Sequence, residues 1–218
     1  MTEPSPEPDE VEPKRKKHLT LIRSFSLADL ITLSNGASGM GAVLLCMAYV
    51  GSSESVLMWG ALGLLPLALV FDIADGWVAR WRHRSSPYGA DLDSLADVVS
   101  FGVAPAAIGF ALGLDGCFDA LVLIYFVGCG ISRLARFNVT ADDLMTDKGK
   151  VSHFEGTPIP TSVLLVVVLA IAFGTDAVHD AIWLGSVDLF SLTFHPLVLL
   201  YFVSGTAMVS ATLKIPKL

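Results

Sequence analysis

The chain has 218 residues, of which 53% are hydrophobic and only 16% are charged, and its mean hydropathy is +0.65. A soluble domain usually contains about 25% charged residues, so this composition excludes an ordinary soluble protein and indicates an integral membrane protein. The formal net charge of −7 does not describe a uniformly acidic surface, because five of the 21 acidic residues lie among the first dozen. The three cysteines have no metal-binding spacing and indicate no metal site.

The chain begins with a polar segment that differs in composition from everything after it. It reads "MTEPSPEPDEVEP" and is followed by the basic run "KRKK" at 14–17. Such a segment cannot bury enough apolar surface to order itself. We therefore predict a disordered tail over 1–18 and a membrane domain over 19–218. We interpret the basic run as an anchor on anionic lipid headgroups, and no basic domain accompanies it to indicate a nucleic-acid partner.

Six apolar stretches follow the tail, and each is a candidate for a membrane-spanning helix. A helix needs about 20 residues to cross the roughly 30 Å hydrocarbon layer of a bilayer. Residues 181–187 are assigned to the membrane interface rather than to a span. The predicted fold is an all-α, multi-pass membrane protein with six transmembrane helices over about 28–50, 55–80, 92–114, 118–136, 157–175 and 189–213.

The positions of the basic residues support this count and predict an orientation. In the six-span arrangement all 14 Lys and Arg residues fall on one side, and the connections 51–54, 114–117 and 176–188 contain none. Short loops rich in Lys and Arg face the cytoplasm. We therefore predict cytoplasmic N and C termini in the cell membrane, with the end of the second helix and the start of the third also facing the cytoplasm.

Four aspartates stand where the second apolar stretch ends and the third begins. Asp72 and Asp75 are three residues apart, and Asp93 and Asp97 are four apart, so each pair shares one face of a helix. The turn sequence "PYGA" at 87–90 allows the two pairs to face each other. Ionised carboxylates near lipid are costly and usually functional. Four of them without a counter-ion would repel one another or take up protons, so a merely solvated loop explains the set poorly.

Two divalent cations would balance the four carboxylates. Oxygen ligands suit Mg²⁺ or Mn²⁺, and two such ions about 4 Å apart are a known device for phosphoryl transfer. Gly76 and Ala79 are small and leave one helix face open for a ligand. Arg80 lies one helical turn beyond Gly76, and its guanidinium group can bind phosphate oxygens. The segment therefore indicates a metal-assisted site for a phosphate-containing ligand.

The same segment resembles the signature of the CDP-alcohol phosphotransferase family. The eight fixed residues of that signature are all present over 26 positions, as Asp72-x2-Asp75-Gly76-x2-Ala79-Arg80-x8-Gly89-x3-Asp93-x3-Asp97. The resemblance implies a six-helix membrane enzyme, usually a homodimer, with two metal ions held by the four aspartates. It implies that Asp97 is also the base that deprotonates the acceptor hydroxyl. The residues implied to border the CDP moiety, with Arg80 on the diphosphate, are Gly76, Ala79, Arg80 and Gly89.

Members of this family attack a CDP-linked lipid or alcohol and release CMP. Four further stretches, "TLSNGASGM", "DVVSFGVAPA", "SRLARFN" and "FEGTPIP", are similar to the phosphatidylserine synthase branch of the family. The implied reaction transfers the phosphatidyl group of CDP-diacylglycerol to the hydroxyl of L-serine. The resemblance covers about residues 28–175.

Several polar residues outside the aspartates are candidates for binding substrate. Serine has a carboxylate, which Arg133 and Arg136 at the end of the fourth stretch could bind, although both could instead be snorkelling anchors. We assign Asn35 to the CDP site and Ser100 to the acceptor site, with a bond to a neighbouring helix as the alternative for each. His195 is interpreted as a helix-packing or interfacial residue on the side away from the aspartates.

Two kinds of alternative stay open. The acceptor could be glycerol 3-phosphate or an inositol compound with the same chemistry, and the donor could be an archaeal CDP-lipid. A protein of a different class, a divalent-cation transporter, would use the aspartates as an ion site. It would favour carboxylates near the middle of the membrane, and it leaves unexplained the residues Gly76, Ala79, Arg80 and Gly89.

Overall fold

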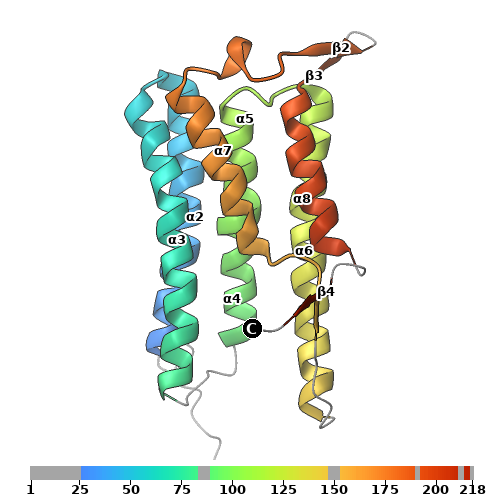
Figure 1. Ribbon diagram of the computed structural model, residues 1–218. Helices are drawn as coiled ribbons and strands as arrows, with labels where there is room; N and C mark the ends of the chain where they lie inside the picture. Colours follow the sequence, from blue (N-terminus) through green and yellow to red (C-terminus); the bar gives the residue numbers. More distant parts are fainter. Residues whose placement is uncertain (1–25, 83–88, 147–152, 190–191, 211–213, 217–218) are drawn as a thin grey trace, which may run out of the picture.

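The structure is a bundle of apolar helices that lie roughly along one axis (Figure 1). It is a computed structural model that describes residues 26–82, 89–146, 153–189, 192–210 and 214–216. Within these ranges four helical segments are long and apolar enough to cross a membrane, namely Leu27–Ser52, Ser55–Val78, Gly89–Ala111 and Cys117–Val139. Two shorter apolar helical segments follow, Ile159–Gly174 and Pro196–Val209.

The first helix, α2 (Leu27–Ser52), begins at a capping box. Ser26 Oγ accepts a hydrogen bond from the Asp29 amide at 3.2 Å, and Asp29 Oδ2 accepts one from the Ser26 amide at 2.6 Å. Two backbone donors at the helix start are thereby satisfied. The helix ends at Ser53, whose backbone is left-handed (φ 56°), and α3 (Ser55–Arg82) returns alongside it (Figure 1).

The third long segment is continuous but irregular in its middle. It consists of α4 (Gly89–Asp97), the π-helix η1 (Val98–Val103) and α5 (Ala104–Ala111). Pro105 has no amide hydrogen, so it cannot donate to the Phe101 carbonyl and one α-helical bond is lost there. The Ala104 amide donates to the Val99 carbonyl, five residues earlier. The wide turn starts directly after Asp97, and π-helical turns are frequent at functional sites.

The rest of the described chain completes the bundle and covers one end of it. Helix α6 (Cys117–Thr146) lies beside α8 (Leu199–Val209), and α7 (Val163–Gly174) lies between them and α3 (Figure 1). The segment 181–187, assigned to the interface, passes over the end of the bundle and does not cross it. The remaining short elements are β1 (His153–Glu155) with its antiparallel partner β4 (Lys214–Pro216), β2 (Val187–Leu189) with β3 (Leu192–Phe194), and the 3-10 turns η2 (Ile159–Ser162), η3 (His179–Ala181) and η4 (Pro196–Val198).

Small residues lie at the helix contacts, as expected for helices that associate in lipid. Ala42 on α2 and Ala61 and Ala68 on α3 have no exposed surface. The outward faces are apolar instead of polar. Trp77 and Trp81, near the end of α3, are 73% and 78% exposed, which is the arrangement of aromatic residues at a membrane–water interface.

Each of the six predicted stretches contains a helix, which confirms the mainly helical membrane fold. The last two helices are shorter than predicted, because Pro160 and Pro196 lie in 3-10 turns that precede α7 and α8. Six membrane spans and cytoplasmic termini therefore stay predictions. The predicted tail, 1–18, lies outside the described residues.

Candidate active site

The four motif aspartates, which we call the aspartate cluster, come together where the ends of α3 and α4 approach each other. Carboxylate oxygens of Asp72 and Asp75 on α3 and of Asp93 on α4 all lie within 4.8 Å of one another. Asp97, one turn further along α4, is close enough to interact electrostatically with the other three. Helical spacing puts each pair on one face, and α2, which packs against both α3 and α4, brings the two faces together.

The carboxylates of the aspartate cluster are buried or half-buried. Asp75 and Asp97 are each only 6% exposed, and like charges repel more strongly there than in water. Asp93 Oδ1 is buried and has no hydrogen-bond partner among the described residues. An unpaired buried oxygen is unfavourable, and a divalent cation is the partner that suits several carboxylate oxygens at this spacing. The cluster could therefore hold a divalent metal ion.

Helix α2 donates hydrogen bonds to the aspartate cluster. Thr32 Oγ1 donates to Asp75 Oδ2 at 2.6 Å, and Asn35 Nδ2 donates to Asp97 Oδ1 at 3.1 Å. In addition, Ser100 Oγ in η1 donates to the Asn35 carbonyl at 2.8 Å. One helix thus contacts both halves of the cluster, the half on α3 and the half on α4.

Thr32 is a contact residue that the sequence interpretation missed. It lies three residues before Asn35, so the two side chains share a helix face, and two polar residues on one face of an apolar helix are the signal that could have found it. Asn35 and Ser100 are both 0% exposed. Each makes a hydrogen bond to a neighbouring helix, the alternative left open for it, and their predicted contacts with CDP and with the acceptor stay predictions.

A cavity of about 290 Å³ lies between the aspartate cluster and α6. Asp93, Asp97 and Arg133 line it together. In the described part of the chain, Arg133 Nε is buried without a hydrogen-bond partner. Ser94 Oγ donates to Asn138 Oδ1 at 3.1 Å, which links α4 to α6 at the cavity wall. The other lining residues are Ala90, Leu134, Phe137 and Pro158. A small ligand there would meet both a guanidinium group and carboxylates.

For the remaining predicted site residues the structure gives a position in a helix. Gly76 follows Asp75 on α3 and is half-buried, and Gly89 is the first residue of α4. The side chains of Ala79 and Arg80 lie outside the described part of the structure, so their predicted contact with CDP stays a prediction. Arg136 is exposed on α6 and does not belong to the described lining of the cavity.

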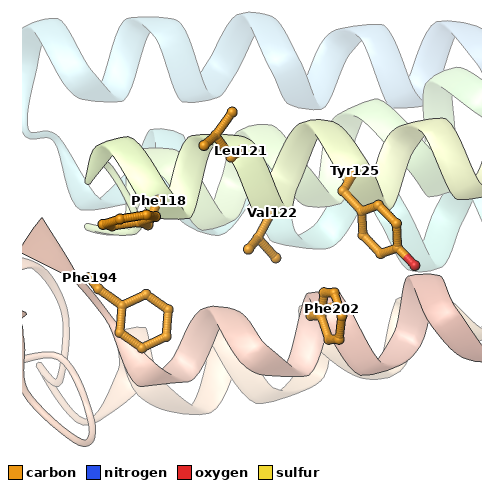
Figure 2. A pocket seen from close by; sticks show the side chains of 6 residues that line it. All are labelled: Phe118, Leu121, Val122, Tyr125, Phe194 and Phe202. Carbon is orange, nitrogen blue, oxygen red and sulfur yellow. The ribbon is translucent and has the colours of Figure 1, made fainter. Parts of the chain in front are cut away.

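A second cavity, of about 350 Å³, lies between α6 and the segment that contains β3 and α8. Figure 2 shows aromatic rings from both sides facing this space. Its described lining contains no carboxylate, imidazole or guanidinium group and consists of Phe118, Leu121, Val122, Tyr125, Phe194 and Phe202. Such a lining provides no metal ligand and no general base, so this cavity is not a candidate active site.

His195 connects the start of η4 and α8 to α6 at the end of the bundle opposite the aspartate cluster. Asp119 Oδ1 accepts a hydrogen bond from the His195 amide at 3.0 Å, and Asp119 Oδ2 lies 2.5 Å from His195 Nδ1. The Gly116 amide donates to the same carboxylate at 3.1 Å. Asp119 and His195 are 0% and 7% exposed. The interpretation of His195 as a helix-packing residue is confirmed.

Comparison with known proteins agrees with the family resemblance of the aspartate segment. The family model described as CDP-alcohol phosphatidyltransferase matches residues 25–209, which include the whole aspartate cluster. A Saccharomyces cerevisiae protein named CDP-diacylglycerol–serine O-phosphatidyltransferase is 44% identical over 206 residues, which cover 92% of this chain and 74% of that protein. An archaetidylserine synthase of Methanothermobacter thermautotrophicus is 39% identical over 66% of this chain and 58% of that protein. A CDP-diacylglycerol–serine O-phosphatidyltransferase of Methanocaldococcus jannaschii is 34% identical over 68% of this chain and 62% of that protein.

Proposed function

Because the chain belongs to the CDP-alcohol phosphatidyltransferase family, we propose that it transfers the phosphatidyl group of CDP-diacylglycerol to the hydroxyl of L-serine. The products are phosphatidylserine and CMP. The observation that carries the proposal is the 44% identity, over 92% of the chain, to a relative whose name states this reaction. The relative named archaetidylserine synthase supports serine as the acceptor and leaves an archaeal CDP-lipid as the alternative donor.

We assign the aspartate cluster to two divalent cations, Mg²⁺ or Mn²⁺. The spacing of three of the carboxylates, the nearby fourth and the unpartnered Asp93 Oδ1 support this assignment. The residues that would hold the ions are Asp72, Asp75, Asp93 and Asp97. When bound, the ions neutralise the diphosphate and stabilise the charge that develops on the phosphoryl and leaving oxygens.

Asp97 is the proposed general base. It lines the cavity beside Arg133, and the hydrogen bond from Asn35 occupies its Oδ1, which leaves Oδ2 to accept a proton. Asp97 takes the proton of the serine hydroxyl. The hydroxyl oxygen then bonds to the lipid phosphorus, and the bond from that phosphorus to the CMP oxygen breaks.

The cavity of about 290 Å³ is the proposed acceptor site. The serine carboxylate needs a cationic partner, and Arg133 has a buried Nε with no partner among the described residues. Arg136, predicted with it, lies on an exposed part of α6, so we assign the carboxylate to Arg133. One guanidinium group suits a zwitterion, whereas the phosphate of glycerol 3-phosphate would favour a more cationic cavity.

The CDP moiety is assigned to the end of α3 and the start of α4, where the family signature places Gly76, Ala79, Arg80 and Gly89. The aspartates lie in the second half of the apolar segment Ser55–Val78 and in the first half of the segment Gly89–Ala111, so the cluster lies toward one end of the bundle, which supports an enzyme over a divalent-cation transporter. We further propose six membrane spans, a cytoplasmic active site and a homodimer.

The test is CMP release by the purified full-length protein in detergent, with CDP-diacylglycerol and Mn²⁺ or Mg²⁺. L-Serine, glycerol 3-phosphate and myo-inositol phosphate are offered in turn. Release that requires both metal and serine is expected. Release with another acceptor would overturn the assignment of Arg133. If folded, metal-loaded protein releases no CMP with any acceptor, Mn²⁺ uptake into liposomes becomes the next measurement, because a transporter predicts it.

Replacing the proposed base separates catalysis from folding. Asp97→Asn removes the proton acceptor while keeping the side-chain size, and we expect turnover to fall by about 10²-fold to 10⁴-fold. Asp91→Asn is the matched control, because Asp91 is exposed in the first turn of the same helix and is not a signature residue. Turnover of Asp97→Asn equal to that of the control would exclude Asp97 as the base.

A further inference from the structure

We propose that Thr32 and Asn35 are positioning residues of the metal site, and that α2 fixes the orientation of one metal-binding carboxylate on each of the two neighbouring helices. The inference rests on the proposed function, because it takes the aspartate cluster as the metal site. It concerns residues outside the eight-residue signature, and it gives them a role toward the metal ions rather than toward CDP or serine.

Each of the two hydrogen bonds from α2 is made to one oxygen of an aspartate carboxylate. Thr32 engages Asp75 Oδ2 at 2.6 Å, and Asn35 engages Asp97 Oδ1 at 3.1 Å. A carboxylate has about four lone-pair sites, so each aspartate keeps capacity for an ion beside its hydrogen bond. A hydrogen bond to one oxygen also restricts rotation of the carboxylate plane. Partners of this kind orient metal ligands and tune their affinity.

The Thr32 contact is more than the usual bond of a threonine to its own helix. Its Oγ1 also lies 3.1 Å from the Ala28 carbonyl, but one hydroxyl has a single hydrogen to donate. The shorter contact is the one to Asp75, and a charged acceptor makes the stronger hydrogen bond. Thr32 is 4% exposed, so water does not compete for this hydrogen. The hydroxyl is therefore assigned to Asp75.

Asn35 is held from two directions. Its carbonyl accepts from Ser100, and its side chain donates to Asp97, so the residue is bonded twice to one continuous segment, α4 and η1. Asn35 Oδ1 is buried and has no partner in the described part of the chain. An unpaired buried amide oxygen is unfavourable, and an apolar residue would avoid it. The need for an N–H donor to Asp97 explains why an amide occupies the position.

The experiment measures Mn²⁺ binding to the purified full-length protein in detergent, from the electron paramagnetic resonance signal of free Mn²⁺. Thr32→Val removes the hydroxyl at nearly constant volume, and we expect the Kd for Mn²⁺ to rise by about 10-fold to 100-fold. Thr32→Ser keeps the hydroxyl and should restore most of the affinity. Ser38→Ala is the matched control, because Ser38 is buried on the same helix and its hydroxyl donates to the Ser34 carbonyl.

A second readout separates positioning from packing. A packing defect lowers the Tm equally with and without Mn²⁺, whereas a positioning defect reduces the rise in Tm that Mn²⁺ produces. Asn35→Leu tests the other contact and carries the test if Thr32→Val does not fold. We expect the same loss of affinity and of the Mn²⁺-dependent rise in Tm.

The outcomes distinguish this inference from the proposed function. If wild-type protein binds Mn²⁺ and Asp75→Asn loses it, the metal site stands. Wild-type affinity in folded Thr32→Val and Asn35→Leu would then overturn the positioning role alone. If wild-type protein binds no Mn²⁺, the metal assignment and the positioning role are both wrong.

Discussion

A single methyl group at position 39 is expected to separate α2 from η1 and disable the active site. A Cβ on Gly39 would lie 2.5 Å from Ser100 Oγ, 2.6 Å from Ser100 Cα and 2.8 Å from the Ser100 backbone nitrogen. Nonbonded carbon atoms pack at about 3.5–4.0 Å, so Gly39→Ala requires the two segments to move apart by about 1 Å. Two of the three contacts are with backbone atoms, so a change of rotamer cannot relieve them.

The displacement would act directly on the proposed base. Ser100 lies three residues after Asp97 and donates to the Asn35 carbonyl at 2.8 Å, while Asn35 donates to Asp97 at 3.1 Å. A further 1 Å would break both hydrogen bonds. Misplacement of a catalytic group by about 1 Å can reduce turnover by about 100-fold, and overpacking costs about 1–3 kcal/mol of folding free energy. We therefore expect Gly39→Ala to lose both turnover and thermal stability.

The assay compares CMP release and Tm with those of Gly128→Ala. Gly128 lies in the middle of α6, and no atom would lie within 4 Å of an added Cβ there. The substitution and its effect on helix propensity are the same at both positions, so the steric contact is the difference between them. Equal turnover in the two variants would refute the argument that close α2–η1 packing sets the position of Asp97.

Two further predictions concern the acceptor cavity and the opposite end of the bundle. Arg133→Lys keeps the charge but loses Nε, so the KM for serine should rise by about 10-fold, more than in Arg136→Lys; equal KM values would contradict the assignment of Arg133. Asp119→Leu removes the carboxylate that the Gly116 amide, the His195 amide and His195 Nδ1 now contact. These buried groups lose their partner, so the free energy of unfolding should fall by about 3–5 kcal/mol. A thermal shift in detergent measures this loss. Unchanged Mn²⁺ affinity in the folded fraction is expected, because β3 and the start of α6, beside which His195 and Asp119 lie, are at the end of the bundle opposite the start of α4 (Figure 1).

The convergence of the aspartates could be predicted from sequence because it depends on local periodicity. Spacings of three and four residues put each pair on one helix face, and the turn sequence "PYGA" at 87–90 predicts that the two faces meet. The contributions of α2 could not be predicted in the same way. In lipid both the outward and the inward faces of a helix are apolar, so hydropathy does not show which face of α2 meets α3 and α4. The polar residues Thr32 and Asn35 mark that face.

The π-helical backbone of η1 could not be predicted from the sequence either. The apolar stretch after Asp97 predicts one helix, and one continuous segment is present, but its middle is the π-helix η1. Pro105 explains the missing α-helical bond; the sequence does not tell how the preceding turn accommodates it. The same limitation applies to α8. The apolar run at about 189–213 contains β3 and the extended residue His195 before its helix starts.

Buried carboxylates occur at both ends of the bundle, and their hydrogen bonds distinguish a structural role from a functional one. Asp119 uses both oxygens, and its three donors come from the protein itself, so it has little capacity left for a ligand. The aspartate cluster is incomplete by comparison. Each α2 contact occupies one oxygen of its aspartate, and Asp93 Oδ1 is buried without any partner in the described chain. A fold that needed these carboxylates for packing alone would satisfy Asp93 as it satisfies Asp119, so the unsatisfied Asp93 Oδ1 supports the proposed metal site, and the proposed chemistry, at this end.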